Sequence, residues 1–167
     1  EGWGLTITEA MLAGTPFISN VTGGMQDQMR FEDENGEWFT PSPEIPSNHR
    51  KTFTKHGEWV LPCYPTSRSI QGSPATPYIF DDRCRWEDAT EHLVTLYNMT
   101  REERKALGLK GRDWATSDEA GFTAKHQANR VMGAFTELFD TWKPREKYEI
   151  VNATKYKGKH LPHKIYY

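Results

Sequence analysis

Residues 1–24 read EGWGLTITEAMLAGTPFISNVTGG and place two carboxylates and two glycine turns around one short helix. Gly2 and Gly4 allow backbone conformations that other residues avoid, and they let a ligand approach the chain closely. Residues 5–13 have the apolar pattern of a helix. The first N–H groups of such a helix have no internal partner, and its dipole is positive there. The sequence therefore predicts a phosphate-binding turn where the glycines meet the helix.

Two glutamates, Glu1 and Glu9, flank this turn. Both can accept hydrogen bonds from sugar hydroxyls while the amides between them face phosphate groups. The alternative is that both are solvated surface charges and that the glycines serve an ordinary turn. A short glycine motif by itself does not decide between the two interpretations.

The residues after the predicted helix indicate two short strands and the turns before them. Gly14-Thr15-Pro16 predicts the end of the helix, and 17–21 reads as a short buried strand. Gly23-Gly24 predicts the next turn. The turn signal at 33–36 precedes a second predicted strand at 37–39.

Taken together, residues 1–24 resemble the nucleotide-sugar half of the retaining GT-B glycosyltransferases, in the large family often called glycosyl transferases group 1. The shared features are two glutamates separated by seven residues, an A-x-x-x-G-x-P stretch, a strand and a Gly-Gly turn, in this order. The resemblance covers residues 1–40 well and the helical region 85–142 loosely. It implies an α/β fold: a partial Rossmann-like C-terminal domain of the GT-B type, with short parallel strands followed by C-terminal helices.

The resemblance also implies roles for particular residues. Glu9 matches the glutamate that binds the ribose hydroxyls, and Glu1 matches the catalytic glutamate that approaches the donor sugar. Gly23 and Gly24 match a turn near the donor pocket. The backbone that would contact the sugar and diphosphate belongs to Gly2, Trp3, Gly4, Leu5 and Thr6.

The implied reaction is retaining transfer of a hexosyl group from a nucleotide-diphosphate sugar to a hydroxyl of a saccharide, lipid or protein acceptor. Catalysis would come from positioning and from stabilisation of the departing charge. The resemblance implies neither a cofactor nor a metal, and the lack of an Asp-x-Asp and of a His/Cys cluster with ligand spacing agrees with this. Two alternatives stay open: a non-catalytic sugar-nucleotide-binding module, and a piece that only docks to a partner.

Family members carry an acceptor domain before this motif, whereas the present chain begins at the motif. We therefore expect a fragment that lacks the N-terminal acceptor domain. Its nucleotide-sugar-binding domain would cover 1–142, with a basic C-terminal tail at 143–167.

Residues 41–80 have no counterpart in the family pattern and look like a long proline-rich insertion. Prolines interrupt any long element there, and a loop of this length is usually functional or disordered. Trp59 could stack on a sugar and Arg68 could meet a phosphate, in which case the insertion shapes the donor or acceptor pocket. Alternatively, the aromatic residues anchor the loop to its own domain.

Three helices are predicted in 85–142. Thr100 and Glu103 have the spacing of a capping box, and Pro144 closes the last helix. We expect their apolar stripes to belong to the core. These stripes are Trp86, Ala89, Leu93, Leu96 and Tyr97; then Leu107 and Trp114; then Val131, Phe135, Leu138 and Trp142. The resemblance further implies that 119–142 crosses back onto the acceptor domain, which would leave an apolar face bare here.

Charge and cysteine content limit the kinds of partner and cellular location that the sequence allows. The net charge of −2 gives no sign of a nucleic-acid-binding protein, and no apolar run is long enough to cross a bilayer. The tail at 143–167 carries a net charge of +5. It either contacts anionic lipid or is a solvated arm. We expect a cytoplasmic protein, peripheral at the membrane if the tail binds lipid. Cys63 and Cys84 are either unrelated thiols or, in an oxidising compartment, a disulfide.

Overall fold

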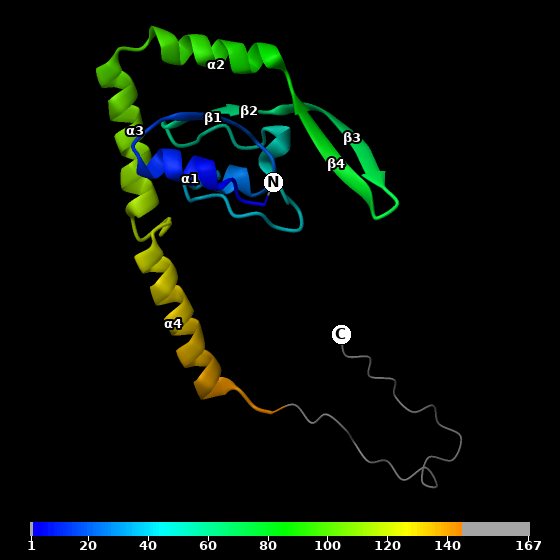
Figure 1. Cartoon of the computed structure of the whole chain (residues 1–167), viewed down its shortest axis with the longest axis vertical. Helices are drawn as coiled ribbons and strands as arrows, with labels where there is room; N and C mark the ends of the chain where they lie inside the picture. Colours follow the sequence, from blue (N-terminus) through cyan, green and yellow to red (C-terminus); the bar gives the residue numbers. More distant parts are fainter. Residues whose placement is uncertain (1, 145–167) are drawn as a thin grey trace. The chain divides into compact units, whose positions relative to one another are not determined.

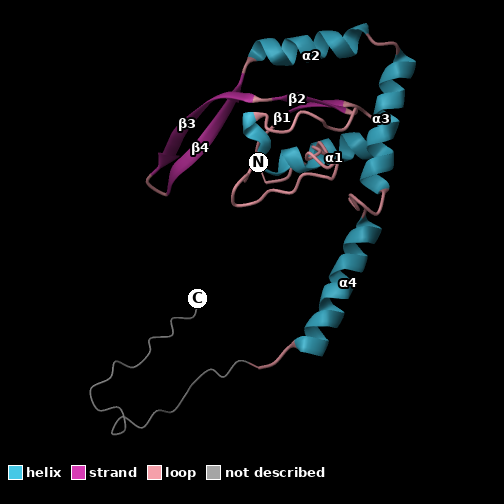
Figure 2. Ribbon diagram, turned by 180° about the vertical axis from the view of Figure 1, so that it is seen from behind, coloured by secondary structure: helices cyan, strands magenta, loops and turns pink. Residues whose placement is uncertain are grey.

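A computed structural model describes residues 2–144 and divides the chain into two compact units, 1–129 and 130–167. Figures 1 and 2 show the elements of the first unit in order. They are α1 (Leu5–Leu12), β1 (Phe17–Asn20), the 3-10 helices η1 (Gly23–Gln28) and η2 (Asn48–Arg50), β2 (Val60–Cys63), β3 (Pro65–Ser73), β4 (Thr76–Cys84), α2 (Trp86–Asn98) and α3 (Arg101–Thr116). Helix α4 (Ala124–Thr141) crosses the division.

The first unit is mixed α/β, with a short parallel sheet and helices. Strands β1 and β2 run parallel, with Phe17 opposite Val60 and Asn20 opposite Cys63. Helices α1 and α2 lie on opposite sides of this two-stranded sheet in both views (Figures 1 and 2). Strands β3 and β4 form a separate antiparallel hairpin.

The partner of β1 is not the strand predicted at 37–39. Those residues form only an isolated antiparallel bridge, between Glu32 and Trp38, because the turn at 33–36 folds them directly back on the preceding segment. The true partner, β2, lies inside the region interpreted as an insertion. Pro62 is tolerated in it because β2 is an edge strand, where a missing N–H costs no ladder bond. The second half of 41–80 is therefore strand and hairpin rather than loop.

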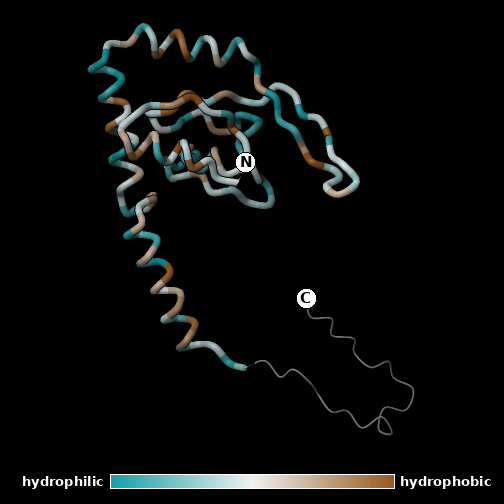
Figure 3. Tube along the Cα trace, viewed as in Figure 1, coloured by the Kyte–Doolittle hydropathy of each residue, from teal (hydrophilic) through white to brown (hydrophobic). Residues whose placement is uncertain are grey.

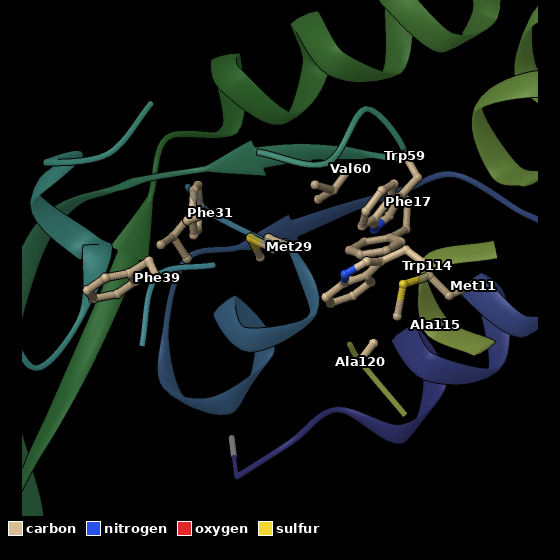
Figure 4. Packing of buried hydrophobic residues seen from close by; sticks show 11 residues of the cluster. Met11, Phe17, Met29, Phe31, Phe39, Trp59, Val60, Trp114, Ala115 and Ala120 are labelled. Carbon is tan, nitrogen blue, oxygen red and sulfur yellow. The ribbon is translucent and has the colours of Figure 1, made fainter. Parts of the chain in front are cut away.

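A cluster of aromatic and sulfur-containing side chains fills the core. The indoles of Trp59 and Trp114 stack with ring centroids 5.0 Å apart, and Phe17 and Met11 lie beside them (Figure 4). The Trp59 indole N–H donates to the backbone oxygen of Gln28. Trp59 is 6% exposed, so it anchors its segment to the domain and is not available to stack on a sugar.

Two glycines of α3, Gly108 and Gly111, let this helix pack closely on the residue pair Gly14 and Trp59. A β-carbon at Gly108 would lie 1.8 Å from the carbonyl oxygen of Gly14, and one at Gly111 would lie 2.7 Å from the Trp59 ring. The two glycines cost helix propensity but allow this close contact. The capping box predicted at the start of α3 is confirmed: Thr100 Oγ1 accepts from the Glu103 N–H, and the Glu103 carboxylate accepts from the Thr100 N–H.

The apolar stripes of α2 and α4 do not enter a core within the described residues. For α2 this is contrary to expectation, whereas for α4 it agrees with the bare apolar face that the resemblance implies for 119–142. Trp86, Leu93 and Tyr97 on α2 are exposed, and neither helix contains a buried residue. Apolar positions recur along both helices in Figure 3. The exposed large apolar side chains on α4 are Val131, Met132, Phe135, Leu138 and Phe139, and Trp142 follows the end of the helix. Of the predicted stripes, only the α3 residue Trp114 is buried.

Candidate functional site

The site is built around the start of α1. Gly4 precedes the helix in the left-handed conformation, with φ 82° and ψ 68°, which favours glycine over any residue with a β-carbon. No side chain of Gly4 can cap the helix, and no acidic residue lies in its first turn. The first turn of α1 therefore carries no carboxylate of its own, which is compatible with an anion-binding helix terminus.

The structure brings the two predicted glycine turns together. A β-carbon at Gly24 would lie 1.9 Å from the carbonyl oxygen of Gly2 and 3.2 Å from the α-carbon of Trp3. On the other side, Gly4 faces the side chain of Met25, which follows Gly24 in η1. Gly23 begins η1 with φ 51°. Residues that are about twenty positions apart in sequence thus form one backbone surface beside the start of α1.

A buried hydrogen-bond chain holds this surface together. The Thr8 hydroxyl accepts from the Trp3 indole at 2.8 Å and donates to the Gln28 amide oxygen at 2.7 Å. The Gln28 amide nitrogen in turn donates to the backbone oxygens of Trp3, at 2.5 Å, and Gly4, at 3.3 Å. Gln28 is fully buried, so its bonds are shielded from competing water.

Sequence reasoning missed both Thr8 and Gln28. A signal existed for Thr8, since it shares the buried side of α1 with Met11. A hydroxyl on an apolar helix face requires an internal hydrogen-bond partner. No comparable signal marks Gln28, because it lies in a polar stretch without periodicity.

The predicted carboxylate Glu9 lies on the exposed side of α1, as do Leu5 and Thr6. Leu5 and Glu9 are one turn apart, so they share a face of the helix. The side chain of Glu9 is thus accessible to solvent. The predicted catalytic residue Glu1 lies outside the described residues, as does the basic tail from 145 onward.

The hairpin reaches this site through Asp82. Its carboxylate accepts from the Thr22 hydroxyl at 2.8 Å, immediately before Gly23, and from Arg68 Nε at 2.5 Å and Nη2 at 3.1 Å. The hydrogen bond from Arg68 holds the pKa of Asp82 below its ordinary value, and the bond from Thr22 acts in the same direction. Arg68, predicted to meet a phosphate, is therefore ion-paired within the hairpin at the edge of the glycine surface.

Histidine 49 lies near the same ion pair. Its Nδ1 atom is buried and has no hydrogen-bond partner among the described residues. Burial lowers the pKa of His49, and the positive charges of Arg68 and Arg50 lower it further. The Asn48 N–H bonds the Gln26 amide oxygen at 2.8 Å, which fixes this segment against η1. The segment that carries His49 thus packs on η1 through Asn48 and lies near Arg68.

A separate pocket of about 490 Å³ lies between segment 51–56, β2 and α2. Its lining is Lys51, Thr54, His56, Pro62, Tyr64, Asp88, Glu91 and His92. None of the predicted donor-site residues belongs to it. The Lys51 ammonium lies 5.2 Å from the centroid of the Tyr64 ring, and burial raises the pKa of Tyr64 to about 12. The phenol is therefore protonated at neutral pH.

Comparison with known proteins finds no matching family model, no matching curated protein and no matching solved structure. Within residues 2–144, no group of three or more His, Cys, Asp or Glu side chains could hold a metal ion. Over the same residues, none of the helices has the length and apolar character needed to cross a bilayer.

Proposed function

We propose that the first unit binds a nucleotide-diphosphate sugar at the start of α1, and that the protein transfers the hexosyl group with retention of configuration. One observation carries the proposal. The turns at Gly2–Gly4 and Gly23–Gly24 meet beside a helix start that has no side-chain cap, with Glu9 exposed on the same helix. The spacing of Glu1 and Glu9 agrees with this assignment.

Each part of the donor has a suitable group on this surface. The diphosphate would lie against the amides at the start of α1, where the helix dipole is positive and the first turn carries no acidic residue. The Glu9 carboxylate would accept hydrogen bonds from the ribose hydroxyls. Because glycine has no β-carbon, Gly23 and Gly24 let the donor approach the backbone closely.

In this proposal the protein positions the donor and the acceptor and forms no covalent bond to either. In retaining transfer the leaving diphosphate itself helps to deprotonate the acceptor hydroxyl on the same face of the sugar. Glu1 would approach the donor sugar, and the amides of α1 would stabilise the departing charge. The acceptor is a hydroxyl of a saccharide, lipid or protein.

The finer fold assignment belongs to the same proposal. A parallel pair of strands with helices on opposite sides is compatible with part of a Rossmann-like domain of the GT-B type. The exposed apolar side chains of α4 are compatible with a last helix that contacts an acceptor domain. Both features support the assignment at the level of architecture.

Calorimetry with UDP-, GDP- and ADP-sugars tests the donor site. We expect Glu9→Gln to weaken binding about 10- to 100-fold, because hydrogen bonds to a charged group contribute about 1.5–3 kcal/mol. Glu102→Gln, an exposed glutamate on α3, is the matched control and should leave the affinity unchanged. Equal affinities for the wild type and Glu9→Gln would contradict the ribose role.

Activity separates an enzyme from a non-catalytic binding module with the same surface. The expected product keeps the anomeric configuration of the donor, which proton NMR coupling constants report directly. Tight donor binding without turnover on saccharide, lipid and peptide acceptors would favour the binding module instead. An absence of binding to all three nucleotide sugars would contradict both.

A further inference from the structure

The two cysteines meet at the base of the β3–β4 hairpin. Cys63 ends β2 and Cys84 ends β4. The Cys84 thiol donates a hydrogen bond to the backbone oxygen of Cys63, with an Sγ–O distance of 3.3 Å. Both thiols are free. Residues 63 and 84 are therefore neighbours, although the sequence alone left them as unrelated thiols or a disulfide.

Strand pairing holds the two backbones side by side. Pro65, the first residue of β3, is the cross-strand partner of Cys84, and Cys63 precedes it by two positions. In Figure 1, β2 leads into β3 at the same place where β4 leads into α2. The pairing of Pro65 with Cys84 thus brings the ends of β2 and β4 together.

The two thiols differ in access. Cys63 is 2% exposed, whereas Cys84 is half-buried and is therefore the one that a small molecule reaches first. Burial raises the pKa of Cys84 to about 11, and the neighbouring Cys63 contributes in the same direction. Burial also raises the pKa of Cys63. Both groups are thus thiols at neutral pH, and their reaction with a disulfide is slow there.

We propose that Cys63 and Cys84 form a reversible dithiol–disulfide site that locks the base of the hairpin. The oxidant is a low-molecular-weight disulfide. The Cys84 thiolate attacks one of its sulfurs, forming a mixed disulfide and releasing one small thiolate. The Cys63 thiolate then attacks the Cys84 sulfur and displaces the second.

The exchange balances without any other reactant. Two protein S–H bonds and the S–S bond of the oxidant are replaced by one protein S–S bond and two small thiols. Two electrons pass from the protein to the oxidant, and the two protein protons end on the released thiols. Excess small thiol reverses both steps.

The consequence is a hairpin whose two ends cannot separate. A two-stranded hairpin is only marginally stable by itself. Its strands carry exposed apolar side chains, among them Ile70, Tyr78 and Phe80. A cross-link between residues 63 and 84 restricts the open states of the whole segment between them. It also holds Asp82 close to Thr22, at the start of η1.

Oxidation of the full chain with glutathione disulfide, followed by intact mass spectrometry, tests the site. We expect the main product to be a monomer that has lost two hydrogen atoms and no longer reacts with iodoacetamide. Because the chain has only two cysteines, such a product defines the pairing. Its rate of formation should rise from about pH 7 to about pH 9, as thiolate becomes available.

Two variants and one further measurement complete the test. Cys63→Ala should stop at a glutathione adduct on Cys84, and Cys84→Ser should form no intramolecular product. Hydrogen exchange in 65–84 should slow on oxidation of the wild type, while exchange in α3 stays unchanged. A stable glutathione adduct on the wild type, covalent dimers, or a reduced chain at about pH 9 would each overturn the proposal.

Discussion

Gly24 lies directly against the carbonyl group of Gly2, with no room for a side chain between the two segments. A β-carbon at Gly24 would lie 1.9 Å from the Gly2 oxygen. Real side-chain carbons do not approach so closely, and the neighbouring atoms belong to backbone that cannot rotate away. The contact therefore requires glycine at residue 24, and it joins η1 to the turn before α1.

Gly24→Ala should destabilise the first unit by about 1–3 kcal/mol, because the added carbon overpacks a backbone contact. Guanidinium unfolding followed by tryptophan fluorescence measures the change. Gly2→Ala is the control, since a β-carbon there meets nothing within 4 Å and should change stability by less than about 0.5 kcal/mol. Equal effects of the two substitutions would be inconsistent with the described contact.

Gln28→Ala should also lower the free energy of unfolding. It removes the buried acceptor of the Thr8 hydroxyl and the side-chain donor to the backbone oxygens of Trp3 and Gly4, at a cost of about 1–3 kcal/mol. Gln127→Ala, on the exposed part of α4, is the matched control and should be nearly neutral. If the nucleotide-sugar proposal holds, calorimetry should show weaker donor binding for Gln28→Ala in protein that remains folded.

Gly108→Ala separates packing from helix propensity. Propensity predicts a gain of about 1 kcal/mol on replacing a helical glycine by alanine. The close approach of Gly108 to the Gly14 carbonyl predicts a net loss instead. Gly133, on α4, has nothing within 4 Å of the added carbon, so Gly133→Ala should raise the helical circular dichroism signal. A stabilising effect of Gly108→Ala in chemical unfolding would show that α3 is not packed as described.

Trp59→Ala should cost about 3–5 kcal/mol of stability, as expected for removing a buried aromatic side chain. The loss follows from its stacking on Trp114, whatever the ligand. Trp86→Ala removes an indole that is 74% exposed, and it should leave the unfolding midpoint almost unchanged. An unaltered midpoint for Trp59→Ala, with altered ligand affinity alone, would favour a pocket role for this residue.

The ion pair between Asp82 and Arg68 should affect the stability of the fold at acid pH. A carboxyl group whose pKa is lower in the folded chain stabilises the fold fully above its ordinary pKa of 3.8. This contribution is lost as the pH falls through the lower folded value. Carbon-detected NMR titration should therefore place the Asp82 pKa below 3.8 in the wild type and higher in Arg68→Gln. An Asp82 pKa that is unaffected by Arg68→Gln would exclude the described pairing.

Local chemistry made several elements predictable. Helix α1 and strand β1 follow from the glycines, the apolar spacing and Pro16, and the start of α3 follows from the Thr100–Glu103 capping box. These signals act over a few residues and do not depend on the rest of the fold. The prediction that Gly2–Gly4 and Gly23–Gly24 are turns rests on the same local signals.

Long-range pairing was not predictable in this way. Nothing local indicates that β1 pairs with residues 60–63 rather than with 37–39, because the choice depends on how the intervening chain closes. The contact of Gly24 with Gly2 and the role of Gln28 likewise arise only when η1 packs on the turn. Apolar periodicity identified α2 and α4 as helices, but it could not tell a buried face from an exposed one.

The hydrogen-bond chain through Gln28 has a consequence for binding thermodynamics. Because Trp3 and Gly4 are already tied to Thr8 and Gln28, the turn is preorganised. A ligand at this surface need not supply the free energy to order a loop, so little conformational entropy should be lost on association. Its measured affinity should then report the contacts themselves, and substitutions on the turn should act mainly through the dissociation rate.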